Sequence, residues 1–168
     1  MSEFEFRCTC CGDIHKGIPT FGAEFPVTVL QVAEDQRESR VDLGTDDCVI
    51  DGKEFYVKGC IEIPVTGFSE PFIWATWVSL SEESYHKFVD SFDLDSRSHI
   101  GPFTGWHYCD FAVYEIECIN LETRVHLRDN GIRPLIELMP SDHPLALEQK
   151  KGITRDRLIQ IYEKMMHG

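Results

Sequence analysis

Two apolar segments in the middle of the chain have the patterns of neighbouring β-strands. In residues 54–63 apolar and polar side chains alternate, which is typical of a strand with one buried face. Residues 72–80 are apolar on both faces, which indicates a strand in the centre of a sheet. Because only a short polar loop after Pro64 separates the two segments, we expect them to form a β-hairpin.

Two later segments have the periodicity of helices. Between residues 81 and 92 apolar side chains recur at i, i+3, i+4 and i+7, which predicts an amphipathic helix. Ser79 and Glu82 fit a capping box at its start, and Ser81 is an alternative N-cap. A second amphipathic helix, with the same apolar spacing, is predicted to follow Thr154.

The dipeptide Asn130-Gly131 lies between two segments of alternating polarity. Both residue types tolerate the positive φ angles of a two-residue type I′ turn, so we expect a second hairpin here. The turn places Arg124 opposite Glu137 on the polar face, as an opposite-charge pair. On the apolar face it sets three pairs of residues opposite one another: Leu127 and Pro134, Val125 and Ile136, and Thr123 and Leu138.

This order of strands and helices predicts an α+β fold with a mostly antiparallel sheet and two or three amphipathic helices. The chain has 168 residues, of which 42% are hydrophobic, and this is enough for one globular core. No repeat or flexible linker interrupts it, so we expect a single domain over residues 1–168. Residues 1–20 would form a zinc-knuckle-like segment packed on that domain.

Charge and cysteine content indicate which classes of partner to exclude and in which cellular compartment the protein is expected. The chain has 16 Lys and Arg but 29 Asp and Glu, a net charge of −13, so we expect no nucleic-acid partner. We also expect no membrane partner, because no apolar run is long enough to span a bilayer. The first residues lack the pattern of a signal peptide, and seven cysteines are an odd number for a disulfide framework. These features predict a cytoplasmic protein.

A cysteine motif near the N-terminus is the main candidate for chemistry. Cys8 and Cys11 are three residues apart, with Gly12 directly after them and His15 four residues further on. Two thiolates with this spacing on a tight turn can bind one tetrahedral Zn²⁺ ion, and a histidine in the same loop can be a third ligand. The sequence therefore predicts a zinc site at Cys8, Cys11 and His15.

The fourth ligand has to come from another part of the chain. Cys48, within an acidic stretch, is the first candidate, and His143 is the alternative. Two other interpretations of the cysteines stay open, a redox-active pair and free thiols without a metal. No second Cys-x-x-Cys motif is present to choose between them.

Several motifs together resemble an uncharacterised bacterial family, known as domain of unknown function 2199. They are Cys8–His15, Asp47–Asp51, Phe55–Gly59, Ile61–Val65, Phe72–Glu82, Gly131–Pro134, Asp142–Ala146 and Gly152–Thr154. The resemblance implies a bacterial protein and favours Cys8, Cys11, His15, Cys48 and His143 as one set. It implies no activity.

Three functional hypotheses follow. The first is a non-enzymatic, zinc-stabilised domain that binds a protein partner. The second is a metal-assisted hydrolase, in which an incomplete ligand set leaves zinc an open position for water. The third is an acidic immunity-type protein that neutralises a basic toxin, because most of the acidic residues come before residue 118.

Overall fold

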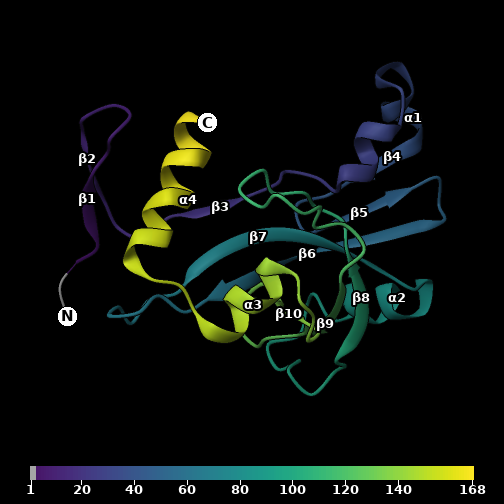
Figure 1. Cartoon of the computed structure of the whole chain (residues 1–168). Coiled ribbons are helices and arrows are strands. Elements are labelled where there is room, and N and C mark those ends of the chain that lie inside the picture. The colour runs from purple at the N-terminus through teal and green to yellow at the C-terminus, as the bar shows by residue number, and fades with distance from the viewer. Residues whose placement is uncertain (1–2) are drawn as a thin grey trace.

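Five strands close into a barrel in the computed structural model, which describes residues 3–168 (Figure 1). The longest pair, β6 and β7, is antiparallel from Phe55 opposite Leu80 to Ile63 opposite Phe72. Antiparallel pairs then connect β7 to β8, β8 to β9 and β9 to β10, and β10 returns to β6 in parallel. The barrel strands are β6 (Glu54–Ile63), β7 (Phe72–Leu80), β8 (Phe103–His107), β9 (Glu122–His126) and β10 (Leu135–Leu138).

Three shorter strands extend the sheet beyond the barrel. β3 (Thr20–Gly22) pairs in parallel with β7. On the other side, β5 (Asp47–Ile50) is antiparallel to β6, and β4 (Val41–Leu43) is antiparallel to β5. A separate two-stranded sheet contains β1 and β2, near the N-terminus.

Four α-helices accompany the strands within the described residues, so the protein has a sheet-rich α+β fold. α2 contacts β6 and β7, and α3 contacts β6 and β10. The helices are α1 (Arg37–Arg40), α2 (Glu82–Asp90), α3 (Pro144–Lys151) and α4 (Arg155–His167), with 3-10 turns at Val27–Gln31 and Glu34–Gln36. No helix among residues 3–168 is long and apolar enough to cross a membrane.

The hairpin predicted in the middle of the chain is confirmed as β6 and β7. Both faces of β7 are covered, because Trp74 and Trp77 point to opposite sides of the strand and are each 0% exposed. The indole Nε1 of Trp77 donates a hydrogen bond to the carbonyl oxygen of Ala23, 3.0 Å away. Trp74 stacks on Phe111, with 4.2 Å between ring centroids. These two tryptophans therefore anchor the core on either side of the sheet.

The helix predicted at residues 81–92 is confirmed as α2, and the structure decides between its two candidate N-caps. α2 begins at Glu82, and the Ser81 hydroxyl accepts a hydrogen bond from the backbone N–H of Ser84. Ser81 is therefore the N-cap, whereas Ser79 lies within β7. The helix ends before Phe92, whose side chain is 42% exposed.

The turn at Asn130-Gly131 is also confirmed, since both residues have positive φ angles of 60° and 72°. β9 and β10 have the predicted register, with Val125 opposite Ile136, Thr123 opposite Leu138 and Arg124 opposite Glu137. The two opposed charges nevertheless do not form an ion pair with each other. Arg124 pairs with Glu122 along its own strand, and Glu137 pairs with His126.

Residues 1–20, where the sequence predicts a zinc-knuckle-like segment, contain the separate two-stranded sheet and the first residue of β3. The first two residues of this segment lie outside the described part of the chain. Beyond the barrel, this sheet lies beside α4, so the N-terminal hairpin and the C-terminal helix are neighbours (Figure 1). That arrangement positions the candidate site.

Candidate metal centre

A short hairpin carries the first three predicted ligands. β1 (Glu5–Arg7) and β2 (Ile14–Lys16) are antiparallel. In the loop between them, the N–H of Cys8 donates to the carbonyl oxygen of Asp13 at 2.8 Å, and the N–H of Gly12 donates to the carbonyl oxygen of Cys8 at 3.0 Å. Gly12 has φ +78°, a conformation that glycine adopts without strain. The loop therefore turns tightly and brings both ends of the Cys-x-x-Cys motif together.

The ligand atoms of four residues converge at this loop. Cys8, Cys11, His15 and His167 each offer one sulfur or nitrogen atom, and these atoms all lie within 4.8 Å of one another. The Sγ atom of Cys11 is 3.4 Å from Nε2 of His15. In a tetrahedral zinc site the sulfur and nitrogen ligands are about 3.6 Å apart, as the Zn–S and Zn–N bond lengths require. The donor set and its spacing therefore fit Zn²⁺.

The fourth member of the cluster is supplied by α4. Thr154 caps this helix by accepting a hydrogen bond from the N–H of Arg157, as the sequence predicts. One face of the helix packs on the hairpin, with 4.9 Å between the ring centroids of Tyr162 and Phe6. His167, in the last turn of the helix, then lies near His15, with 6.4 Å between ring centroids.

The backbone of the loop favours the thiolate of Cys8. Burial opposes ionisation of this thiol, which is 2% exposed, but N–H groups of Cys11 and Cys10 lower its pKa below the ordinary value. The N–H of Cys10 donates to the Cys8 Sγ at 3.4 Å. For Cys11, a hydrogen bond from the Asp13 backbone acts in the same sense, but burial and the adjacent Cys8 sulfur raise its pKa. The loop backbone therefore favours ionisation at Cys8 over Cys11.

A second group of potential metal ligands shares the Cys8 sulfur and includes Glu163 of α4. One ligand atom from each of Cys8, Cys10 and Glu163 lies within 4.8 Å of the other two. The Thr9 hydroxyl donates to Oε2 of Glu163 at 2.5 Å, and this contact lowers the pKa of the carboxyl group. Glu163 is therefore a charged neighbour of the cluster, one helical turn before His167.

The structure does not bring the two candidates for the fourth ligand to this loop. Cys48 is buried within β5, opposite Tyr56 of β6, where burial raises its thiol pKa to about 12. Its sulfur is not part of either group of potential metal ligands found among the described residues. His143 caps α3, since its Nδ1 accepts a hydrogen bond from the N–H of Leu145. Its Nε2 lies 3.0 Å from the carbonyl oxygen of Glu117, so both ring nitrogens have protein partners.

Sequence reasoning missed His167 and Glu163. Both residues lie within the predicted terminal helix, four positions apart, so the pattern places them on one helical face. Nothing in the local pattern says that this face meets the N-terminal loop, because the contact joins opposite ends of the chain. The information missing from the sequence pattern is this tertiary contact between α4 and the N-terminal hairpin.

Comparisons with known proteins identify the family of this chain. No curated protein and no solved structure shows significant similarity to the chain. One family model, described as "Uncharacterized protein conserved in bacteria (DUF2199)", matches residues 7–153. The match includes the Cys-x-x-Cys loop and ends before α4. The chain therefore belongs to this uncharacterised bacterial family, as its resemblance predicts.

Proposed function

We propose that the protein is a zinc-stabilised binding domain in which Cys8, Cys11, His15 and His167 hold one structural Zn²⁺ ion. The proposal rests on one observation, the convergence of two sulfur and two nitrogen donors within 4.8 Å of one another. Such an ion would cross-link the N-terminal hairpin to the end of α4. The hairpin has only three residues in each strand, and isolated hairpins of this kind are marginal in water. Zinc would supply the missing stability.

Four protein ligands favour this structural role over a hydrolase. A tetrahedral ion with four protein donors has no position for water, and a catalytic zinc site usually has three protein ligands and an open position. The hydrolase hypothesis would require His167, which is exposed in the last turn of its helix, to be displaced. Because zinc needs thiolates, the proposal also places the protein in a reducing compartment, the cytoplasm.

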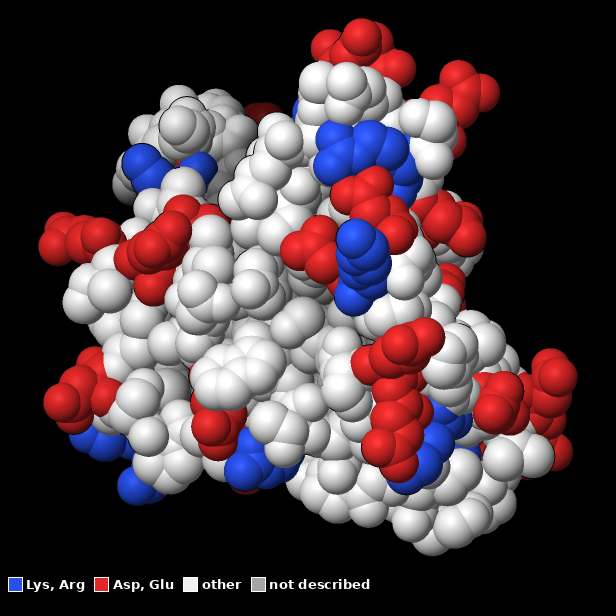
Figure 2. Space-filling view, turned by 90° about the vertical axis from the view of Figure 1, so that its right-hand side faces the viewer, with Lys and Arg blue, Asp and Glu red and all other residues white. Residues whose placement is uncertain are grey.

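The partner expected from the sequence is a protein, and exposed apolar side chains beside the cluster support this. Ile14 and Met166 directly precede His15 and His167, and each is 52% exposed. The acidic-face hypothesis receives less support from the surface in Figure 2. On that face acidic side chains are dispersed, and several lie next to Lys or Arg. A basic toxin would find no continuous acidic surface there.

Metal content measured on matched variants tests the zinc proposal. The purified protein is expected to contain one equivalent of zinc, and Cys11→Ser and His167→Gln are each expected to lose most of it. Cys10→Ser removes a neighbouring thiol outside the four-ligand set, and His86→Gln removes an exposed histidine on α2, so both should keep the metal. If wild type binds no zinc, or Cys10→Ser and Cys11→Ser lose it equally, the four-ligand assignment is wrong.

The coordination shell distinguishes the structural site from a hydrolase. We expect X-ray absorption at the zinc edge to show two sulfur and two nitrogen donors and no oxygen donor. Replacement of zinc by Co²⁺ should give the strong visible bands of a tetrahedral thiolate site. A shell with one oxygen donor in place of the His167 nitrogen would support the hydrolase.

A further inference from the structure

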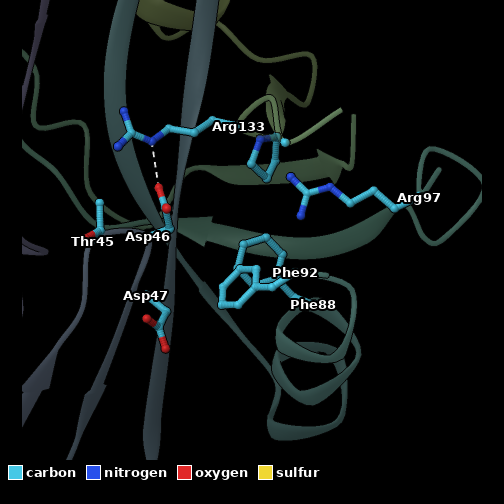
Figure 3. A pocket seen from close by; sticks show the side chains of 9 residues that line it. Thr45, Asp46, Asp47, Phe88, Phe92, Arg97 and Arg133 are labelled. Carbon is cyan, nitrogen blue, oxygen red and sulfur yellow. Dashed lines mark hydrogen bonds and ion pairs between the residues drawn. The ribbon is translucent and has the colours of Figure 1, made fainter. Parts of the chain in front are cut away.

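A pocket of about 330 Å³ lies between β5, the end of α2 and the Asn130-Gly131 turn. Figure 3 shows its lining. Arg97 extends into it from one side, Asp46 and Arg133 lie on the other, and Phe88 and Phe92 line it from below. None of these residues belongs to the zinc cluster.

Arg97 is a buried cation whose guanidinium forms no ion pair among the described residues, although its backbone N–H donates to Oδ1 of Asp129 at 2.7 Å. The residue is 5% exposed, its Nε donates to the carbonyl oxygen of Arg128 at 2.8 Å, and its Nη2 donates to the carbonyl oxygen of Ile132 at 2.9 Å. No ion pair within residues 3–168 involves Arg97, although five other arginines have one. Those five are Arg40, Arg124, Arg128, Arg133 and Arg157. A buried guanidinium without a counter-ion is costly unless a ligand supplies the negative charge.

The two carbonyl contacts leave one edge of the Arg97 guanidinium open. Nε and Nη2 use the side edge of the fork, so Nη1 and the second N–H of Nη2 form a free outer edge. In Figure 3 this end of the side chain points to the interior of the pocket. Two parallel N–H donors on a planar fork match the two oxygens of a carboxylate.

The other charges of the pocket are already engaged. Nε of Arg133 donates to Oδ1 of Asp46 at 2.7 Å, and the Tyr85 hydroxyl donates to Oδ2 of Asp47 at 2.5 Å. Arg97 is therefore the lining cation that can accept a negative group from outside. The two aspartates would repel a doubly charged group, so a carboxylate fits better than a phosphate dianion.

Aromatic and apolar groups complete the lining. Phe88 is 1% exposed and Phe92 is 42% exposed, and their rings pack edge to face with 4.9 Å between centroids. Pro134 faces the same space. A charged group at one end and an apolar surface beside it are typical of pockets that orient small amphipathic ligands.

We propose that this pocket binds a small-molecule carboxylate with an aromatic or other apolar body. The carboxylate accepts two hydrogen bonds from the outer edge of Arg97, and the apolar body lies on Phe88 and Phe92. This site is separate from the zinc cluster and does not require zinc.

Three probes of graded chemistry test the proposal by NMR titration of the 15N-labelled protein. Phenylacetate has both features, 2-phenylethanol lacks the charge and acetate lacks the apolar body. We expect phenylacetate to shift the amides of residues 45–47, 88–97 and 131–134 in a saturable way. The other two probes should bind at least about tenfold more weakly, because one lacks the carboxylate for Arg97 and the other lacks the apolar body for the phenylalanines.

Two variants locate the binding. Phe92→Ala should weaken phenylacetate binding several-fold, whereas Leu94→Ala, at a neighbouring residue with 45% exposure outside the pocket, should leave it unchanged. Arg97→Lys keeps the charge but loses the planar fork, so binding should fall further. If Arg97→Lys unfolds, the three probes and Phe92→Ala still decide. Shifts elsewhere, shifts that do not saturate, or equal binding of phenylacetate and 2-phenylethanol would overturn the proposal.

Discussion

The imidazole ring of His15 lies against the phenol ring of Tyr162, with 5.0 Å between the ring centroids. Tyr162 also contacts Phe6 edge to face at 4.9 Å and Phe21 at 5.7 Å. An aromatic cluster thus joins the hairpin, β3 and α4 directly beside the four candidate ligands. It holds His15 in place without any metal, so the site is partly formed by packing alone.

Tyr162→Ala should therefore weaken both the fold and the proposed metal site. The side chain is half-buried, so we expect a loss of about 2 kcal/mol in the free energy of unfolding, less than for a fully buried aromatic residue. Zinc affinity should fall about tenfold, as for other groups that orient a ligand. Urea unfolding and a competition titration with a chromophoric chelator measure the two effects. Met166→Ala, an exposed change on the same helix, should alter neither.

Removal of the proposed zinc ion should loosen the N-terminal hairpin and leave the barrel intact. The hairpin forms its own two-stranded sheet, and its backbone makes no ladder with the barrel strands. After treatment with a chelator, we expect amide hydrogens in residues 5–16 to exchange at least about tenfold faster, which reports local opening. Amides of β6 and β7 should keep their protection. Unchanged exchange in the hairpin would mean that zinc does not stabilise it.

The sequence was informative where the pattern was local. Alternation predicted β6, a run apolar on both faces predicted β7, and Asn130-Gly131 predicted the register of β9 and β10, because turn geometry and the pleat depend on neighbouring residues. α3 was not predicted, since its first residues follow a turn-like segment and its stability comes from contacts with β6 and β10. Closure of the barrel by the parallel pair of β10 and β6 is equally non-local.

In the candidate site, too, local features were predicted and tertiary contacts were not. Cys8, Cys11 and His15 are close in sequence, and the spacing of the loop was enough to group them. The fourth ligand was assigned to Cys48 or His143, yet Cys48 is occupied by core packing and His143 by capping a helix. Both alternative roles depend on tertiary neighbours that no spacing rule reveals.

Closure of the barrel predicts a strict limit on side-chain size at Gly59. A Cβ atom there would lie 2.6 Å from Cδ1 of Ile136 and 2.9 Å from the carbonyl oxygen of Pro134, where β6 meets β10. Gly59→Ala should thus lower the free energy of unfolding by about 1–3 kcal/mol through overpacking. Ser79→Ala, on the adjacent strand, should cost much less.

A double mutant tests whether that cost comes from the named contact. Ile136→Val removes Cδ1, so it should be less harmful in the Gly59→Ala background than in wild type. We expect a coupling free energy of about 0.5 kcal/mol or more in a double-mutant cycle by urea unfolding. Strictly additive effects would show that the contact with Cδ1 of Ile136 is not the source of the strain.

A buried histidine predicts how stability depends on pH. His107 is 0% exposed, with Nε2 2.6 Å from Oγ1 of Thr76, while Nδ1 donates to the carbonyl oxygen of Cys118 at 2.8 Å. Burial lowers its pKa to about 4, because the charged ring loses its hydration. The ring is therefore neutral in the native protein at neutral pH.

Because the pKa is lower in the folded state, the stability from His107 is complete above the unfolded pKa of about 6.5 and is lost as pH falls toward 4. Between pH 6.5 and about 4 the His107 ring binds a proton in the unfolded chain but stays neutral in the native protein. Between pH 7.5 and 5 this linkage should remove about 2 kcal/mol of unfolding free energy. Urea unfolding at several pH values should show a shallower decline for His107→Gln than for wild type. His99→Gln, at an exposed position, should keep the wild-type slope, and identical slopes for all three proteins would contradict the depressed pKa.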